Sequence, residues 1–312
     1  MNLKKSFSAM MAATGLTVTM AAQADDIGNS FNRQGLSDRL HASCAVQEAQ
    51  RERLVRKLPA GTDPAPAFRN KGITFVIESP HFDQNMKADA DVLFAKIPEH
   101  TKSLAFNEGG VFVWSRYGLA ESLPSRKNNI NGYIIPGLYL PDQKRLYLTF
   151  MLAGLDRKFY AEPARRTRIA NHEAGHMMDD MLGNYSHYKG RQQADGRLTD
   201  RRDYKDALNR DTKRMRQQNT DVTAFSYYAA GSIGGDHNDQ QRLRREVFAE
   251  LWAESSGYGG SGLSKHYPDT YSLVKGFYDH LADTYKASDP RCVYKKDGSA
   301  VPVATSKHVL DL

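Results

Sequence analysis

Apolar residues in the first half of the chain gather in short runs that are rich in β-branched and aromatic side chains. Residues 72–78, with the sequence GITFVIE, form the clearest run and predict a strand. Residues 111–116, 132–140 and 145–150 predict three more strands, and the turn-forming sequence PDQK between the last two predicts a hairpin. This part of the chain is therefore expected to form a sheet.

Helical spacing of apolar residues begins between these strands and dominates after them. Met86, Ala90 and Leu93 recur at that spacing and predict a helix at 85–97. A long helix is expected at 163–182, ending at Gly183. Further helices are predicted at 36–58, 201–216, 243–255 and 267–285. Strands followed by helices predict an α+β fold, with helices packed on a mixed, mainly antiparallel sheet.

The N-terminus has the pattern of a signal peptide. Lys4 and Lys5 precede a short apolar run that ends in the small-x-small sequence Ala22-Gln23-Ala24. We expect cleavage after Ala24 and a secreted or periplasmic protein, because the run is too short to anchor the chain in a membrane. The expected organisation is a signal peptide at 1–24, a helical extension and linker at 25–70, a main domain at 71–290 and a tail at 291–312.

The charge pattern argues against a nucleic-acid partner, and the two cysteines predict a disulfide. The formal net charge is +7, but acidic residues interrupt the basic ones in 201–216, which favours a solvated helix face over a nucleic-acid groove. Weak attraction to an anionic cell envelope is compatible with this charge. In an oxidising compartment Cys44 and Cys292 are expected to form a disulfide, with two buried thiols as the alternative.

The strongest chemical signal is His172-Glu173-Ala174-Gly175-His176, an H-E-x-x-H motif inside the long helix. Residues four apart on a helix are separated by 400°, so the two imidazoles lie within about 40° of each other. They can then bind one Zn²⁺ ion, with Glu173 beside a zinc-bound water as the base. The alternative is a chance pair of surface histidines. Asp179 and Asp180, which follow the motif, are expected on a plain helix face. For Asp179 the alternative is to steady the helix or to bind the outer shell of a ligand.

A third ligand is required, and a later helix offers it. The metzincin pattern fails because Leu182 stands where that pattern needs a third histidine. Glu246, Glu250 and Glu254 form an acidic stripe at i, i+4 and i+8. We expect Glu246 as the ligand and Glu250 as the acceptor of a histidine's free ring N–H. Two alternatives stay open: a register in which Glu250 binds zinc and Glu254 supports it, and a solvated face paired with neighbouring arginines.

The sequences HEAGHMMDDMLG, EVFAELWA and YPDTYSLVKGF, within residues 165–285, resemble the anthrax lethal factor-like metallopeptidases, a group that includes the Pro-Pro endopeptidases. In that family an H-E-x-x-H helix is followed by an E-x-F-A-E helix whose first glutamate binds zinc. The resemblance implies a zincin-like catalytic domain followed by a helical subdomain. It also implies one zinc ion and the same roles for the residues of the site, namely His172, His176 and Glu246 as ligands, Glu173 as base and Glu250 as support.

The chain departs from the family at the residue that stabilises the oxyanion. The family uses a tyrosine shortly before the ligand glutamate, but no tyrosine lies within a turn or two upstream of Glu246. We expect Tyr228 in this role, with Tyr227 as the alternate, and residues 231–239 as an inserted loop. His237 is a further candidate in that loop. The alternatives are packing tyrosines and a surface histidine.

Together these residues predict a zinc-dependent endopeptidase of the gluzincin type that acts on a polypeptide substrate. An extended substrate is expected to add to a sheet edge, formed by residues 111–116 or 145–150. A non-catalytic secreted binding protein on the same scaffold is one alternative, although a purely structural zinc site has no use for Glu173. A zinc amidase acting on a non-peptide cell-wall bond is the other.

Overall fold

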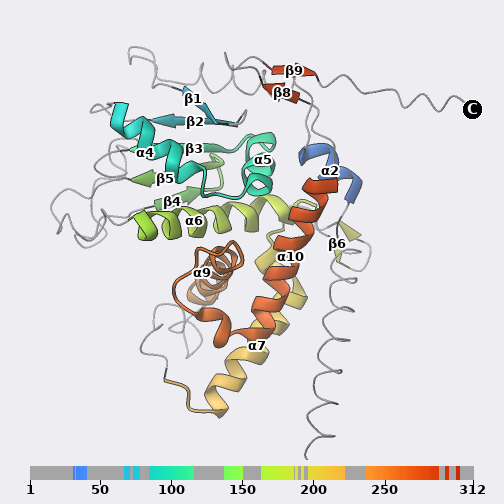
Figure 1. Ribbon diagram of the computed structural model, residues 1–312. Coiled ribbons are helices and arrows are strands. Elements are labelled where there is room, and N and C mark those ends of the chain that lie inside the picture. Colours follow the sequence, from blue (N-terminus) through green and yellow to red (C-terminus); the bar gives the residue numbers. More distant parts are fainter. Residues whose placement is uncertain are drawn as a thin grey trace, which may run out of the picture.

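A computed structural model of the chain (Figure 1) describes the sheet, the main helices and the segments that join them. The described residues are 31, 33–40, 67–70, 73–77, 84–115, 137–149, 163–185, 187–188, 191–192, 196–221, 237–287, 292–294 and 300–302. The expected signal peptide at 1–24 lies outside them. Cys44 also lies outside them, so the structure does not describe its expected pairing with Cys292. The two candidate tyrosines, Tyr227 and Tyr228, lie outside them as well.

A five-stranded mixed sheet forms one layer of the fold, in the order β1-β2-β3-β5-β4. Its strands are β1 (Ala67–Asn70), β2 (Ile73–Ile77), β3 (Val111–Ser115), β4 (Gly137–Leu140) and β5 (Arg145–Thr149). The central pairs β2–β3 and β3–β5 are parallel, whereas β1–β2 and β4–β5 at the two ends are antiparallel. The α+β class and the mixed sheet are confirmed. The expectation of a mainly antiparallel sheet is wrong, because a helical crossover returns the chain in the same direction between β2 and β3.

That crossover consists of two helices, α4 (Gln84–Phe94) and α5 (Glu99–Asn107), of which only the first was predicted. Eight of the nine residues of α5 are buried, although its sequence EHTKSLAFN has no clear apolar stripe. Lys102 is fully buried there, with its Nζ 3.2 Å from the Phe94 carbonyl oxygen and 3.0 Å from a Glu99 carboxylate oxygen. Several buried positions of α5 are therefore polar residues with partners inside the fold. For this reason the spacing of apolar residues in the sequence did not predict the helix.

The long helix α6 (Pro163–Gly183) lies between the sheet and a group of helices on its other side (Figure 1). That group contains α7 (Arg202–Gln217), α9 (His237–Ser255) and α10 (Pro268–Ala287). All these helices were predicted, but α9 begins at His237 rather than near residue 243. Residues 237–239 are therefore helix, not inserted loop. The remaining short elements are α2 (Arg33–Leu40), η2 (Leu198–Asp200), η5 (Leu263–Lys265) and the hairpins β6–β7 (His187–Tyr188, Arg191–Gln192) and β8–β9 (Cys292–Tyr294, Ala300–Pro302).

A glycine lets α6 and α9 approach each other closely. A Cβ added to Gly175 would lie 2.7 Å from the Ala249 Cα and 2.9 Å from its carbonyl oxygen, so no larger residue fits without moving backbone. Met178 on α6 and the aromatic residues Phe248 and Trp252 on α9 are completely buried in the same core. This contact lies inside the H-E-x-x-H motif, and it therefore fixes which residues of α9 face the two histidines.

Within the part of the chain that the structure describes, no helix combines the length and the apolar character needed to cross a membrane.

Candidate metal centre

The two histidines of the motif project from one side of α6, as their helical spacing predicts. The ring centroids of His172 and His176 are 5.0 Å apart, and the ring planes are nearly perpendicular, at 86°. Both side chains are partly buried, with 15% and 16% of their surface exposed. The two side chains are thus sheltered but not sealed from solvent.

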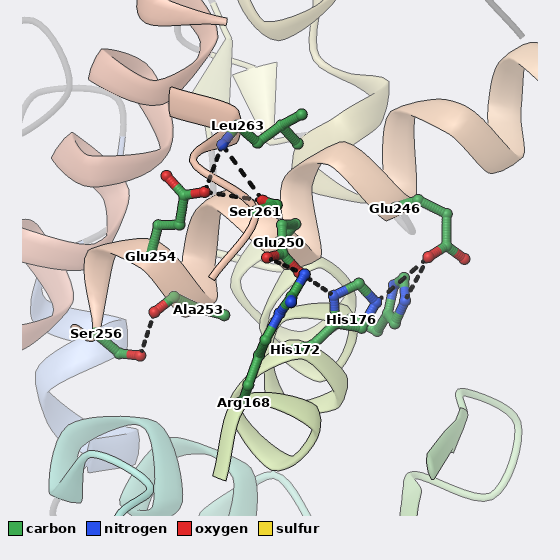
Figure 2. A network of polar contacts seen from close by, with 10 residues as sticks. All are labelled: Arg168, His172, His176, Glu246, Glu250, Ala253, Glu254, Ser256, Ser261 and Leu263. Carbon is green, nitrogen blue, oxygen red and sulfur yellow. Dashed lines mark hydrogen bonds and ion pairs between the residues drawn. The ribbon is translucent and has the colours of Figure 1, made fainter. Parts of the chain in front are cut away.

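Helix α9 brings Glu246 to both imidazoles (Figure 2). The Glu246 Oε2 atom lies 3.3 Å from the Nε2 of His172 and 3.8 Å from the Nε2 of His176. One ligand atom from each of the three residues falls within 4.8 Å of the others. Ligands of a tetrahedral zinc ion at about 2.0–2.1 Å are about 3.3 Å apart, which matches the Glu246–His172 distance, whereas the Glu246–His176 distance is wider. The three residues form a group that could hold a metal ion.

Glu250 binds the opposite nitrogen of His172. Its Oε2 lies 3.1 Å from the Nδ1 of His172, and its Oε1 forms an ion pair with the Nη2 of Arg168 at 2.8 Å. An ionised carboxylate only accepts hydrogen bonds, so Nδ1 of His172 carries a proton and donates a hydrogen bond to Glu250. The Nε2 of His172, on the side of the ring that faces Glu246, would bind a metal ion once it has lost its own proton, as in the carboxylate–histidine–metal arrangement.

The third glutamate of the stripe faces away from the histidines. Glu254 accepts hydrogen bonds from the Ser261 hydroxyl and from the backbone N–H groups of Leu263 and Ser264, at 2.6–3.1 Å. It therefore fastens the loop after α9 to the end of that helix. These contacts favour the register with Glu246 at the metal position over the one with Glu250 there and Glu254 in support.

Glu173 lies against the edge of the sheet. Its Oε2 accepts the backbone N–H of Tyr139 at 3.1 Å. A Cβ on Gly137 would come within 2.7 Å of the Glu173 Cγ, so β4 packs directly on this side chain. The expected edge strands at 111–116 and 145–150 are both internal, and this expectation is wrong. The β4–β5 hairpin folds so that β5 pairs with β3, which leaves β4 as the edge strand among the strands that the structure describes.

Burial and hydrogen bonding shift the pKa values of four side chains of the site: His172, Glu173, Glu246 and Glu250. Burial lowers the pKa of His172, but hydrogen bonds to Glu246 and Glu250 outweigh it and raise the value to about 10. Burial raises the pKa of Glu250, but His172 and Arg168 outweigh it and lower the value to about 2. The His172 and His176 contacts likewise hold the pKa of Glu246 below its usual range, whereas burial raises that of Glu173. A proton and a metal ion would therefore compete for the Nε2 atom of His172.

The two aspartates after the motif do more than occupy a helix face. Asp179 is fully buried and accepts the backbone N–H and the hydroxyl of Thr199, at 2.8 and 2.9 Å. Asp180 accepts the hydroxyl of Tyr139 at 2.7 Å. Both therefore tie α6 to neighbouring segments. Sequence reasoning missed these roles, and those of Tyr139 and Arg168, because each depends on a partner far away in the chain.

Three residues were expected as candidates for stabilising the oxyanion, namely Tyr228, Tyr227 and His237. Tyr228 and its alternate Tyr227 lie outside the described residues. His237 is the first residue of α9, nine residues before Glu246, which places its backbone about 13 Å along the helix axis from that of Glu246. The side chain of His237 lies outside what the structure describes, so its role as an electrophile stays a prediction.

Comparison with known proteins does not add a family to this picture. No protein-family model matches the chain, and a search of curated proteins returned no match. The functional conclusion therefore depends on the geometry of the site and on the motifs that the sequence carries.

Proposed function

We propose that this protein is a zinc-dependent endopeptidase of the gluzincin type, with a zincin-like catalytic domain. One observation carries the proposal: two imidazole nitrogens and a carboxylate oxygen converge within 4.8 Å, and a further carboxylate, Glu173, follows the first histidine on the same helix. The position of α6 beneath a mixed sheet, with strand β4 at its edge, supports the zincin-like assignment.

His172, His176 and Glu246 would hold the zinc ion. When bound, zinc acts as a Lewis acid that polarises the scissile carbonyl and lowers the pKa of water towards neutrality. The chain's own contribution is orientation. Glu250 fixes the tautomer of His172, and the close contact between Gly175 and Ala249 fixes the distance between the two helices that supply the ligands.

Glu173 is the proposed general base. Its carboxylate would take a proton from the attacking water and deliver it to the leaving amine. The Tyr139 N–H holds one oxygen of this carboxylate, and the absence of a side chain at Gly137 leaves room for the other. Such fixed placement lowers the cost of aligning the base with the substrate.

A polypeptide is the proposed substrate, because an extended chain can lie along the exposed edge of a sheet. Strand β4 is the edge that packs against Glu173, so a peptide beside it would pass close to the base. The proposed place of action is the periplasm or the extracellular space, on the strength of the leader-like residues 1–24.

The test compares the wild-type protein with Glu173→Gln, which keeps the size of the side chain and removes its basicity. Metal analysis after zinc loading is expected to give about one zinc ion per chain for both proteins. Each is then incubated with a peptide library prepared from a whole proteome, and new peptide termini are identified by mass spectrometry. Only the wild-type protein is expected to create them, and a chelator is expected to stop it.

Equal cleavage by Glu173→Gln would overturn the role of the base, and a wild-type protein that takes up no zinc would overturn the metal centre. Stoichiometric zinc without any cleaved peptide would favour the binding-protein reading. Release of small amines from cell-wall material alone would favour the amidase reading.

A further inference from the structure

A buried carboxylate connects the candidate metal ligand His172 to a cation on the same helix. Glu250 is 1% exposed, and its two oxygens face different partners, the His172 Nδ1 at 3.1 Å and the Arg168 Nη2 at 2.8 Å. Arg168 lies one helical turn before His172. Figure 2 shows both side chains extending from α6 towards Glu250.

The buried position of Glu250 makes its cationic partner important. A carboxylate removed from water is costly unless charges and donors compensate it. His172 supplies one donor, and Arg168 supplies a full positive charge that does not depend on pH in the physiological range. Without Arg168, the oxygen that faces it would lose its ion pair, and the carboxylate could turn away from His172.

A glycine-rich loop passes close beside the side chain of Arg168. A Cβ on Gly260 would lie 3.1 Å from the Arg168 Nη1 and 3.3 Å from its Cδ, so the loop backbone passes close beside the guanidinium. The same loop is held by Glu254, through Ser261 and the backbone of Leu263 (Figure 2). The third glutamate of the acidic stripe thus fastens the segment that passes beside Arg168, whose side chain is 35% exposed.

We propose that Arg168 is a positioning residue for metal binding, which acts through Glu250 to hold the His172 ring in the orientation that presents Nε2 to the ion. The glycine-rich loop of residues 256–262 keeps Arg168 in place. This inference rests on the proposed metal centre but not on peptidase activity. Arg168 lies outside the H-E-x-x-H motif, so the motif by itself gives no role to its charge.

The experiment measures zinc affinity by competition with a chromophoric chelator, so it needs no substrate. Arg168→Met keeps the apolar stem and removes the charge and its donors. Its zinc affinity is expected to fall about tenfold, at the low end of the range for partners that orient a metal-bound histidine. Arg168→Lys is expected to recover part of this loss, because it retains the charge.

Arg166→Met is the matched control. It removes the same charge from the same helix, but Arg166 pairs with Asp89, whose side chain is 58% exposed, at 3.7 Å. Its zinc affinity is expected to stay within about twofold of the wild type, because the Arg166–Asp89 pair is long and does not involve Glu250 or a candidate metal ligand. Circular dichroism and thermal unfolding establish that each variant is folded before its affinity is compared.

A double-mutant cycle separates positioning from a general structural effect. If Arg168 acts through Glu250, Arg168→Met added to Glu250→Gln lowers the affinity little beyond Glu250→Gln alone. Independent, additive losses would overturn the proposal, as would a wild-type affinity in Arg168→Met. A wild-type protein without zinc affinity would overturn both this inference and the metal centre. Tight zinc binding without peptide cleavage would overturn only the proposed activity.

Discussion

The backbone N–H of Tyr139 donates a hydrogen bond to the Oε2 of Glu173 across 3.1 Å, and so joins the edge of the sheet to the H-E-x-x-H helix. The hydroxyl of the same tyrosine binds Asp180, two turns further along that helix. Strand β4 is therefore held against α6 at two points. The carboxylate proposed as the base is fixed by the sheet as well as by its own helix.

Gly137→Ala tests this contact. The new Cβ would lie 2.7 Å from the Glu173 Cγ and 3.1 Å from its Oε1, so the carboxylate must move. We expect a loss of peptide turnover of at least tenfold and a loss of stability of about 1–3 kcal/mol, as for other overpacked positions. Zinc content should remain at the wild-type level, because the three ligands are not touched. Unchanged turnover would show that the position of Glu173 is not critical.

Glu246→Ala and Glu254→Ala form a matched pair on one helix face. Glu246 approaches both histidines, whereas Glu254 binds the loop around Leu263. Glu246→Ala is expected to weaken zinc binding by well over a hundredfold, because it removes one of the three proposed protein ligands. Glu254→Ala is expected to lower the unfolding temperature, with a zinc affinity within about tenfold of the wild type. Chelator competition and thermal unfolding measure the two effects, and the reverse order would shift the ligand register by one turn.

Gly175→Ala probes the contact between α6 and α9. Its Cβ would meet backbone atoms of Ala249 at 2.7 and 2.9 Å, which no change of side-chain rotamer relieves. We expect the helices to separate slightly, at a cost of about 1–3 kcal/mol in the free energy of unfolding. Zinc affinity should fall as well, because Glu246 moves away from the histidines. Urea denaturation measures the unfolding free energy and chelator competition measures the zinc affinity, both on the same preparation. A variant that keeps the wild-type value of both would contradict the prediction.

His100 makes stability depend on pH in a defined direction. Burial, helped by the charge of Lys286 and opposed by Glu99, lowers the pKa of His100 to about 4. Between pH 6.5 and 4 the unfolded chain binds a proton that the folded protein does not. Stability is therefore lost as the pH falls through this window, by on the order of 3 kcal/mol.

His100→Phe should reduce this loss, because the phenyl ring can keep the edge-to-face contact with Tyr278 and does not titrate. The measurement is the difference in unfolding free energy between wild type and variant at pH 7 and at pH 4.5. The comparison is needed because burial raises the pKa of Asp179 to about 6, which acts in the opposite direction. Parallel pH profiles of the two proteins would contradict the assignment.

Local patterns predicted most of the elements but not their neighbours. The helices that contain the H-E-x-x-H motif and the acidic stripe were predicted from the sequence pattern. The hairpin of β4 and β5 was predicted from its two strand-like runs and the turn sequence between them. Helix α5 and strand β1 were missed. Helix α5 buries polar residues such as Lys102 through partners that lie outside any short window. The edge strand was misassigned because strand order is a property of the whole sheet.

The sequence by itself determined that His172 and His176 share a helix face, that Glu173 follows the first of them, and that three glutamates line one side of a later helix. Helical period alone is sufficient for each of these statements. Only the tertiary structure decided what each glutamate does. The close crossing of α6 and α9 at Gly175 and Ala249 places Glu246 at the Nε2 atoms, Glu250 at Nδ1 and Glu254 at the loop. That division of roles depends on the distance and angle between two helices, which are set by packing across the core rather than by any local pattern.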